Sequence, residues 1–287
     1  MADLETLTGP VAHHGEGPVW DVRTTSLHWV DMLAGDVLRL DPDTGAVERH
    51  HVGAVAAALR PRRDHPGWVV ATERGFAIHD ALAEPAVRTH AAFTDPSVRM
   101  NEGGADPQGR FYCGTMAYDK TPGAGCVYRL DAEGTITTVL TGVTTSNGLV
   151  WSLDGRCAYY VDSPTRRIDA LEFDAEAGTF GTRRAVAHIE PGAGTPDGLT
   201  IDAAGNLWVA LFRGGAVHCY RSSGGLLAVI DVPTPQPTAC TFGGDNLDEL
   251  LITTSAEGLS AAEHPQAGSV FRARPGVTGR PPLPYAG

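Results

Sequence analysis

The sequence predicts an all-β protein built as a six-bladed β-propeller, and three observations lead to this prediction. The chain has 35 glycines and 20 prolines among 287 residues, a density of turn formers that a helical protein would not tolerate. Hydrophobic residues make up 42% of the chain, which is enough for a sizeable buried core. Similar units begin near residues 16, 55, 102, 147, 197 and 238, and their spacing of 39 to 50 residues is typical of four-stranded propeller blades.

The fourth and fifth units show the repeat most clearly. Each begins with a polar residue followed by Gly and a short apolar segment, passes through an Asp- and Gly-containing turn, and continues into a second apolar segment. Their expected strands cover residues 146–151, 157–162 and 168–174 in the fourth unit, and 196–201, 207–210 and 215–220 in the fifth. Short apolar segments between glycine turns indicate strands rather than helices.

The first and third units follow the same pattern, and the second and sixth are weaker copies. No unit contains the sustained i, i+3, i+4, i+7 apolar pattern that a helical solenoid would need. Because a closed ring removes exposed sheet edges, we expect Leu4 to Leu7 to add an outer strand to the blade formed by the C-terminal residues. We expect residues 1–287 to form a single domain, with a flexible tail at about 276–287 around Pro281-Pro282-Leu283-Pro284.

Charge and cysteine content narrow the classes of partner. The formal net charge is −12, from 22 basic and 34 acidic residues, which argues against binding to nucleic acid or to an anionic membrane surface. The five cysteines are scattered and never form a C-x-x-C pair, as expected for reduced thiols. The first residues lack the basic start and apolar run of a signal peptide, and we expect a cytoplasmic protein.

Four oxygen-bearing side chains occupy one position when the units are aligned on their glycines. In a propeller this position lies next to the central channel, so the side chains are expected to converge there. Carboxylates that converge in a narrow channel repel each other unless a cation neutralises them. The four are Glu16, Glu102, Asn147 and Asp197, followed by Gly17, Gly103, Gly148 and Gly198.

An all-oxygen set of Glu16, Asn147 and Asp197 suits one hard divalent cation, with calcium expected first and magnesium or manganese as alternatives. Zinc and iron(II) stay open, although the sequence has no H-E-x-x-H or paired-cysteine site. The competing interpretation is that E-G, N-G and D-G are ordinary turn dipeptides. Their recurrence at one register of a repeat favours the cation site.

Several segments, taken together, resemble the senescence-marker-protein/gluconolactonase/luciferin-regenerating-enzyme (regucalcin-like) family. They cover about residues 15 to 272 in the family's order. The matching segments are Gly15-Glu16-Gly17-Pro18-Val19-Trp20, Arg99-Met100-Asn101-Glu102-Gly103, Asp106-Pro107-Gln108-Gly109-Arg110, Gly114-Thr115-Met116, Ser146-Asn147-Gly148-Leu149, Pro196-Asp197-Gly198-Leu199 and Cys240-Thr241-Phe242-Gly243-Gly244.

The resemblance implies a six-bladed propeller that binds one axial divalent metal and hydrolyses aldonolactones such as gluconolactone. It implies the metal ligands Glu16, Asn147 and Asp197, the same three that the repeat alignment proposes.

For substrate binding the resemblance points to Arg99 and Asn101, and to Asp119 where many members have glutamate. Tyr118 stands beside that residue, and the departure leaves the identity of the sugar open. Glu102 replaces an aspartate common in the family, and we expect it next to the metal, in contact with a bound water.

These assignments lead to a mechanism for a carboxylic ester hydrolase. The metal would polarise the lactone carbonyl, Asp197 would act as the general base for the attacking water, and Arg99 and Asn101 would orient the sugar. A calcium-dependent phosphotriesterase and a non-catalytic metal- or ligand-binding propeller are the alternatives. A serine or cysteine hydrolase is disfavoured because the sequence has no G-x-S-x-G motif. The lactone, its ring size and the oligomeric state stay open.

Overall fold

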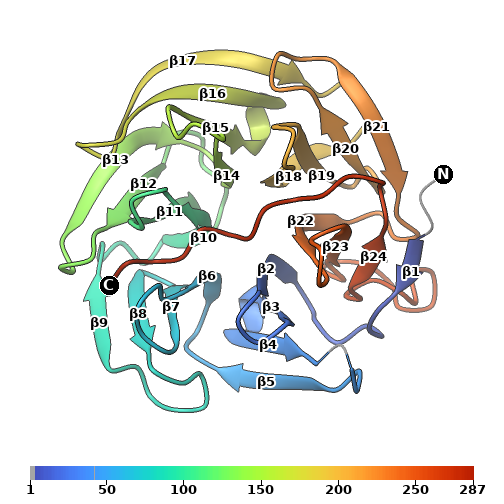
Figure 1. Cartoon of the computed structure of the whole chain (residues 1–287), viewed down its shortest axis with the longest axis horizontal. Helices are drawn as coiled ribbons and strands as arrows, with labels where there is room; N and C mark the ends of the chain where they lie inside the picture. Colours follow the sequence, from blue (N-terminus) through green and yellow to red (C-terminus); the bar gives the residue numbers. More distant parts are fainter. Residues whose placement is uncertain (1–3, 42) are drawn as a thin grey trace.

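The fold is a ring of six four-stranded antiparallel sheets (Figure 1). The computed structural model describes residues 4–41 and 43–287. The expectation of an all-β, six-bladed β-propeller is confirmed.

Each blade contributes one strand to each of four concentric layers. The innermost strands are β2 (Gly15–Asp21), β6 (Ala56–Pro61), β10 (Val98–Ala105), β14 (Ser146–Trp151), β18 (Thr195–Ile201) and β22 (Pro237–Gly243). The second layer consists of β3 (Ser26–Asp31), β7 (Trp68–Thr72), β11 (Phe111–Ala117), β15 (Cys157–Asp162), β19 (Leu207–Phe212) and β23 (Glu249–Thr254). The third consists of β4 (Asp36–Leu40), β8 (Gly75–His79), β12 (Gly125–Leu130), β16 (Arg167–Asp174), β20 (Ala216–Tyr220) and β24 (Phe271–Ala273). The outer layer consists of β1 (Leu4–Thr6), β5 (Val47–His51), β9 (Arg88–Ala91), β13 (Ile136–Val143), β17 (Thr179–His188) and β21 (Leu226–Asp231).

Burial follows the distance from the axis. Every residue of β2, β10 and β22 is buried, whereas most residues of β17 and β21 are exposed. Buried inner strands explain the near-continuous apolar segments in the sequence, because both faces of each inner sheet region pack against a neighbouring blade. Polar side chains on these strands are therefore exceptions that call for a specific reason.

The N-terminal segment closes the ring. Strand β1 pairs antiparallel with β24, with Leu4 opposite Ala273 and Thr6 opposite Phe271. The last blade is thus assembled from both ends of the chain, in the order β1-β24-β23-β22. The predicted outer strand from this segment is confirmed.

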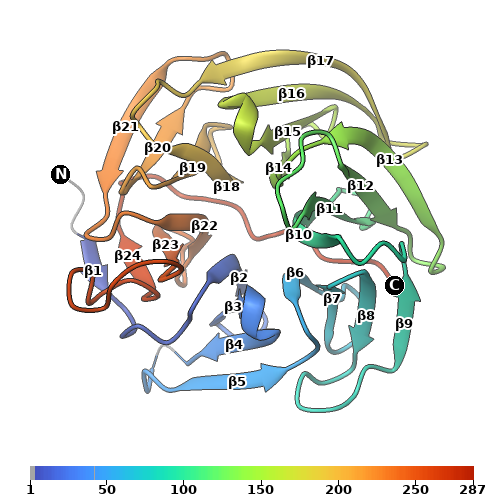
Figure 2. The ribbon, with the colours of Figure 1, turned by 180° about the vertical axis from the view of Figure 1, so that it is seen from behind.

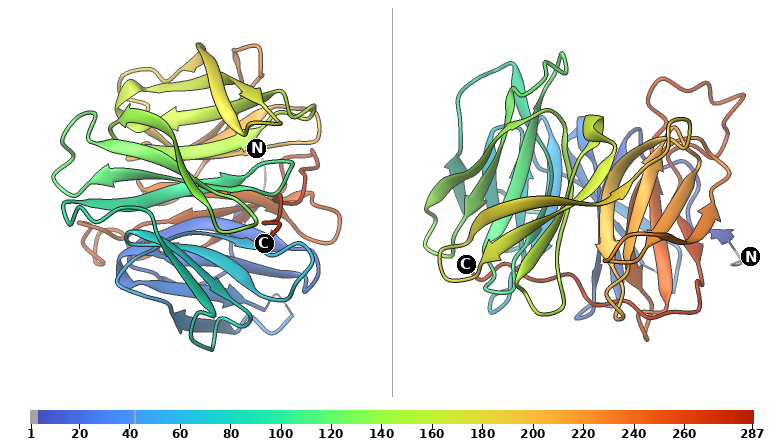
Figure 3. Two further views of the ribbon diagram at one scale, coloured as in Figure 1. Left: turned by 90° about the vertical axis from the view of Figure 1, so that its left-hand side faces the viewer. Right: turned by 90° about the horizontal axis from the view of Figure 1, so that it is seen from above.

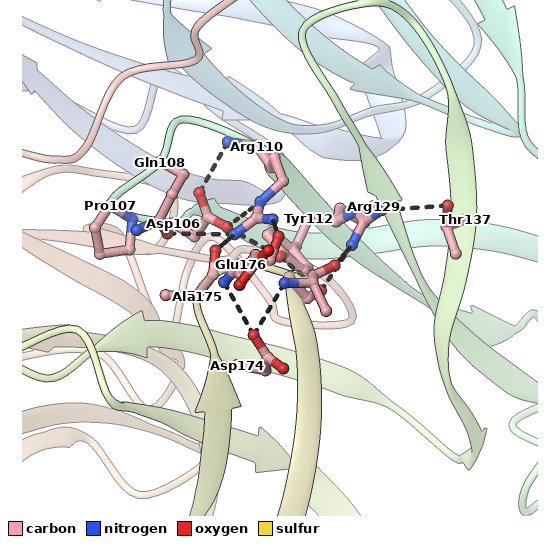
Figure 4. A network of polar contacts seen from close by, with 12 residues as sticks. Asp106, Pro107, Gln108, Arg110, Tyr112, Arg129, Thr137, Asp174, Ala175 and Glu176 are labelled. Carbon is pink, nitrogen blue, oxygen red and sulfur yellow. Dashed lines mark hydrogen bonds and ion pairs between the residues drawn. The ribbon is translucent and has the colours of Figure 1, made fainter.

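In the first, third and fifth blades, the turn between the first two strands contains a buried aspartate. In the third blade, Asp106 accepts hydrogen bonds from the backbone N–H and Nε of Arg110 and from the hydroxyl of Tyr112 (Figure 4). The Arg110 guanidinium also donates to the backbone carbonyls of Ala175 and Glu176, which belong to the fourth blade. The repeated turn therefore links neighbouring blades as well as closing its own hairpin.

The C-terminal segment crosses one face of the ring and passes over its axis (Figure 1). Figure 2 shows the opposite face, and the side view in Figure 3 shows the segment lying flat against its own face. The expectation of a loose tail at about 276–287 is wrong at its end, because Tyr285 is fully buried. The Tyr285 N–H donates to Pro61, its carbonyl accepts from Arg63, and its ring joins the apolar cluster that contains Phe111.

Tyr285 gives a testable stability prediction. Tyr285→Ala is expected to lower the free energy of unfolding by about 3–5 kcal/mol, because a fully buried aromatic ring is removed. Tyr285→Phe keeps the ring and loses only the hydroxyl bond to the Asp131 carbonyl, for a cost of about 1 kcal/mol. Urea unfolding of the two variants measures both values. Equal stabilities for the two variants would contradict the anchoring role.

Helical structure is confined, within the described ranges, to the short turns η1 (Met32–Ala34) and η2 (Ser163–Thr165). Neither has the length or apolar character needed to cross a membrane.

Candidate functional site

Each inner strand contains a β-bulge at about the same depth in the ring. A bulge places an additional residue on one strand and re-aims its side chain, and such bulges are common beside functional sites. The register shifts lie between Glu16 and Val19, Ala56 and Ala58, Met100 and Gly103, Ser146 and Leu149, Pro196 and Leu199, and Pro237 and Ala239.

The bulges bring Asn101 and Asn147 together from neighbouring blades. The Asn101 Nδ2 donates to Asn147 Oδ1 at 2.9 Å and to the Ser146 carbonyl at 2.8 Å. On its other side, Asn147 Nδ2 donates to Ser163 Oγ at 2.7 Å, and Ser163 Oγ donates to the Pro196 carbonyl at 2.7 Å. This network spans three blades and fixes which side of the Asn147 amide carries the oxygen.

The glycines after Asn147 and Asp197 allow neighbouring inner strands to approach closely. A Cβ on Gly148 would lie 2.3 Å from the Cβ of Leu199, and one on Gly198 would lie 2.3 Å from the Cβ of Ala239. Glycine is therefore required here by the packing of blade against blade, which agrees with the sequence argument.

Three carboxylates gather at the same level of the ring. Glu16, Asp197 and Glu102 are 2%, 7% and 7% exposed. Burial raises the pKa of Glu16 to about 7, opposed by the Gly17 N–H that donates to Oε2 and by Arg99. Burial, followed by the charges of Glu16 and Glu102, raises the pKa of Asp197 well above its ordinary value. Burial and Glu16 raise the pKa of Glu102 in the same way.

The structure corrects one part of the repeat alignment. The sequence alignment on glycines made Glu102 equivalent to Asn147 and Asp197, but the strand register makes Asn101 the equivalent residue. Glu102 takes the place of the glycines in the fourth and fifth blades. Its Oε2 is buried without a hydrogen-bond partner among the described residues.

Arg99 is a buried cation beside this cluster and not a surface residue. Its Nη1 donates to Asn101 Oδ1 at 2.7 Å and to Met32 Sδ at 3.0 Å. Its guanidinium lies 5.9 Å from the centre of the exposed Tyr118 ring. Burial lowers the pKa of Arg99, and its charge lowers the pKa of Glu16 and Asp197.

Asp119 lies apart from this network. It is exposed in the loop after β11, and its Oδ1 accepts from the Thr121 N–H at 2.9 Å. That bond lowers the pKa of Asp119 and fixes the turn. Its contacts among the described residues are those of a loop acid, and its role toward substrate stays a prediction.

Residues on the connecting turns complete the site, and the sequence analysis did not find them. Ser163 and Met32 lie on the two short helices, each of which follows a second-layer strand. Ser163 accepts a hydrogen bond from Asn147, and the Met32 sulfur accepts one from Arg99. His14 is buried against Ser255, with 2.8 Å between Nδ1 and Oγ, and burial lowers its pKa to about 4. None of these residues recurs in the repeat, so the sequence carried no signal for them.

The donor chemistry fits a hard divalent cation. Within residues 4–41 and 43–287, neither oxygen of Asp197 accepts a hydrogen bond, and Glu102 keeps an unpartnered oxygen. Buried carboxylates in this state stay ionised only beside a positive charge, and the charge of Arg99 acts on both Glu16 and Asp197. No group of three or more His, Cys, Asp or Glu side chains in these ranges has metal-binding geometry, and the predicted set combines two carboxylates with the amide oxygen of Asn147.

Comparison with known proteins gives the family. A model of the SMP-30/gluconolactonase/LRE-like region matches residues 14–256. The chain is 35% identical to a protein named regucalcin from Danio rerio over 95% of both chains. It is 37% identical to the pentonolactonase XacC of Haloferax volcanii over 93% of this chain and 92% of that one. The crystal structure of a calcium-binding protein, regucalcin from Agrobacterium tumefaciens, matches with a TM-score of 0.92 and 27% identity, covering 99% of this chain and 97% of that one. The chain therefore belongs to the SMP-30/gluconolactonase/LRE-like family.

Proposed function

We propose that this protein hydrolyses a sugar lactone to the aldonic acid, with a divalent cation held by Glu16, Asn147 and Asp197. The observation that carries the proposal is the buried, mutually repelling pair of Glu16 and Asp197 beside an amide oxygen fixed by hydrogen bonds. A relative with the name pentonolactonase, 37% identical, supports the substrate class. Calcium is the proposed ion, because the ligands are all oxygens and a relative is described as calcium-binding.

The chain's own residues have distinct tasks in this reaction. Asp197 has no competing hydrogen bond in the described part of the chain and would accept the proton of the attacking water. Arg99 and Asn101, locked to each other at 2.7 Å, would orient the sugar hydroxyls. A bound divalent cation would supply Lewis acidity toward the lactone carbonyl. The cytoplasmic location and the absence of nucleic-acid or membrane partners stay predictions.

Proton release tests the proposed activity directly, because opening a lactone yields an acid. Gluconolactone and pentonolactones would be added to chelator-treated protein in a pH-indicator assay, with calcium, manganese, magnesium, zinc or iron(II) restored in turn. We expect acid production well above the spontaneous rate with at least one cation. Two outcomes would reject the lactonase proposal. One is acceleration of phosphotriester hydrolysis but not of lactone hydrolysis, and the other is no acceleration of lactone hydrolysis with any of the cations.

Asn101 provides a prediction that separates binding from chemistry. Asn101→Ala removes a group that contacts Arg99 and Asn147 but is not proposed to transfer a proton. We expect KM for the lactone to rise about tenfold or more, since one hydrogen-bonding site for substrate is lost, with a smaller fall in kcat. Steady-state kinetics would show the split. A large fall in kcat at unchanged KM would remove Asn101 from the substrate-orienting role.

A further inference from the structure

A cavity of about 410 Å³ lies beyond the candidate site, on the face crossed by the C-terminal segment. Its walls include the C-terminal halves of the inner strands, such as Gly104–Ala105 of β10 and Leu199–Ile201 of β18, which follow the bulges. Glu102 is the one predicted site residue that lines it. The cavity therefore extends from Glu102 along the axial region away from Glu16, Asn147 and Asp197, which do not line it.

The walls of this cavity combine apolar and polar surface in similar amounts, and its size suits a small molecule. Leu149, Trp151 and Ile201 line one side, and Pro282 and Leu283 of the C-terminal segment line another. The segment is held in place by the buried Tyr285, so this wall is already formed in the free protein. Small-molecule sites commonly measure about 300–1,000 Å³ and have mainly apolar walls with a few charged groups.

Three arginines line the same cavity although the chain has a net charge of −12. Arg60 lies deeper, where its guanidinium donates to the carbonyls of Leu59 and Gly103, near Glu102. Arg156 and Arg280 are exposed and form no ion pair within the part of the chain that the structure describes. The local excess of positive charge on an acidic protein favours an anionic ligand.

The acidic residues of the cavity reduce this preference without reversing it, because two acids face three arginines. Asp154 accepts hydrogen bonds from Ser152 Oγ at 2.7 Å and from the Arg156 N–H at 3.1 Å, which hold its charged carboxylate in its own turn near Arg156. Glu102 lies at the inner end beside Arg60. An anionic group is therefore favoured near Arg156 and Arg280, and an apolar body is favoured deeper in the cavity.

We propose that this cavity is a second ligand site that binds an amphipathic organic monoanion, a carboxylate or sulfonate on an apolar body. The anionic group would lie against Arg156 and Arg280, and the apolar body would pack against Trp151 and Leu283. An uncharged, hydroxyl-rich sugar lactone lacks both features and is not the ligand of this site. The proposal does not depend on the lactonase activity.

Fluorescence titration with 8-anilinonaphthalene-1-sulfonate tests the proposal on the full-length protein. We expect saturable 1:1 binding, displacement by decanoate, and no displacement by gluconolactone. The double variant Arg156→Glu/Arg280→Glu is expected to lower the affinity at least about tenfold. The matched control Arg88→Glu/Arg184→Glu changes the net charge equally at exposed positions on β9 and β17 and should bind as the unmodified protein does.

Both double variants are expected to fold, because all four arginines are exposed, and thermal unfolding would check this. A second variant, Ile201→Trp, would fill part of the cavity and is expected to weaken binding without changing the surface charge. Non-saturable binding, equal losses in the two double variants, or displacement by gluconolactone would overturn the proposal.

Discussion

Asp197→Ala is expected to abolish lactone hydrolysis, with kcat falling by about 10³-fold or more. The substitution removes the proposed general base and one of two proposed anionic cation ligands. Because burial, Glu16 and Glu102 all raise the pKa of Asp197, the carboxylate is held at an energetic cost to the fold. A buried carboxylate with a strongly raised pKa at a candidate site is typical of a functional residue rather than of a residue that stabilises the fold.

A comparison of Asp197→Asn with Asp202→Asn isolates this functional role. Asp202 is a buried aspartate of the same blade, and it accepts hydrogen bonds from two backbone N–H groups, the Asn206 amide and the Trp208 indole. We expect Asp202→Asn to lower the unfolding temperature and to leave the kcat of the folded enzyme nearly unchanged. Asp197→Asn should raise the unfolding temperature of cation-free protein while kcat collapses. Full activity in Asp197→Asn would eliminate the proposed mechanism.

The fold could be predicted from the sequence because each blade repeats one pattern with its own local turn signals. The unit starts predicted near 147 and 197 fall at Ser146 and Thr195, the first residues of β14 and β18. The position of the C-terminal segment could not be predicted, because it depends on contacts with residues distant in the sequence and not on local turn signals. Its prolines suggest a loose tail, whereas Tyr285 is buried by contacts with residues more than 100 positions away in the sequence.

In the candidate site, too, the sequence did not identify every residue and its position. Alignment on glycines made Glu102 equivalent to Asn147, but the strand register makes Asn101 the equivalent residue, because Glu102 stands where the fourth blade has Gly148. The sequence alone does not reveal this offset, because the third blade has a glycine, Gly103, one residue later. Ser163 could not be predicted either, because it reaches Asn147 from a turn outside the repeated strands.

Removal of the proposed cation is the second change with a large expected effect, and its pH dependence has a definite sign. Burial raises the pKa of Glu16 from 4.5 to about 7 in the folded protein. Between these pH values the folded state holds a proton that the unfolded chain has released, so the stability of cation-free protein falls as pH rises. The loss from Glu16 alone is on the order of 3 kcal/mol by pH 7.

Calcium bound at the proposed site should reverse this trend, because it would bind the deprotonated carboxylates. At a hundredfold excess over its Kd, a cation that binds only the folded state adds about 2.7 kcal/mol of stability. We therefore expect calcium to raise the unfolding temperature strongly at pH 8 and little at pH 5, where protons compete for the same oxygens. Chelator-treated protein should lose lactonase activity at pH 8 and regain it when calcium is restored. Glu16→Gln should weaken both effects, while Glu263→Gln, at an exposed position, should change neither. An unfolding temperature that does not respond to any divalent cation at pH 8 would show that the three carboxylates gathered on the axis are neutralised by protons alone.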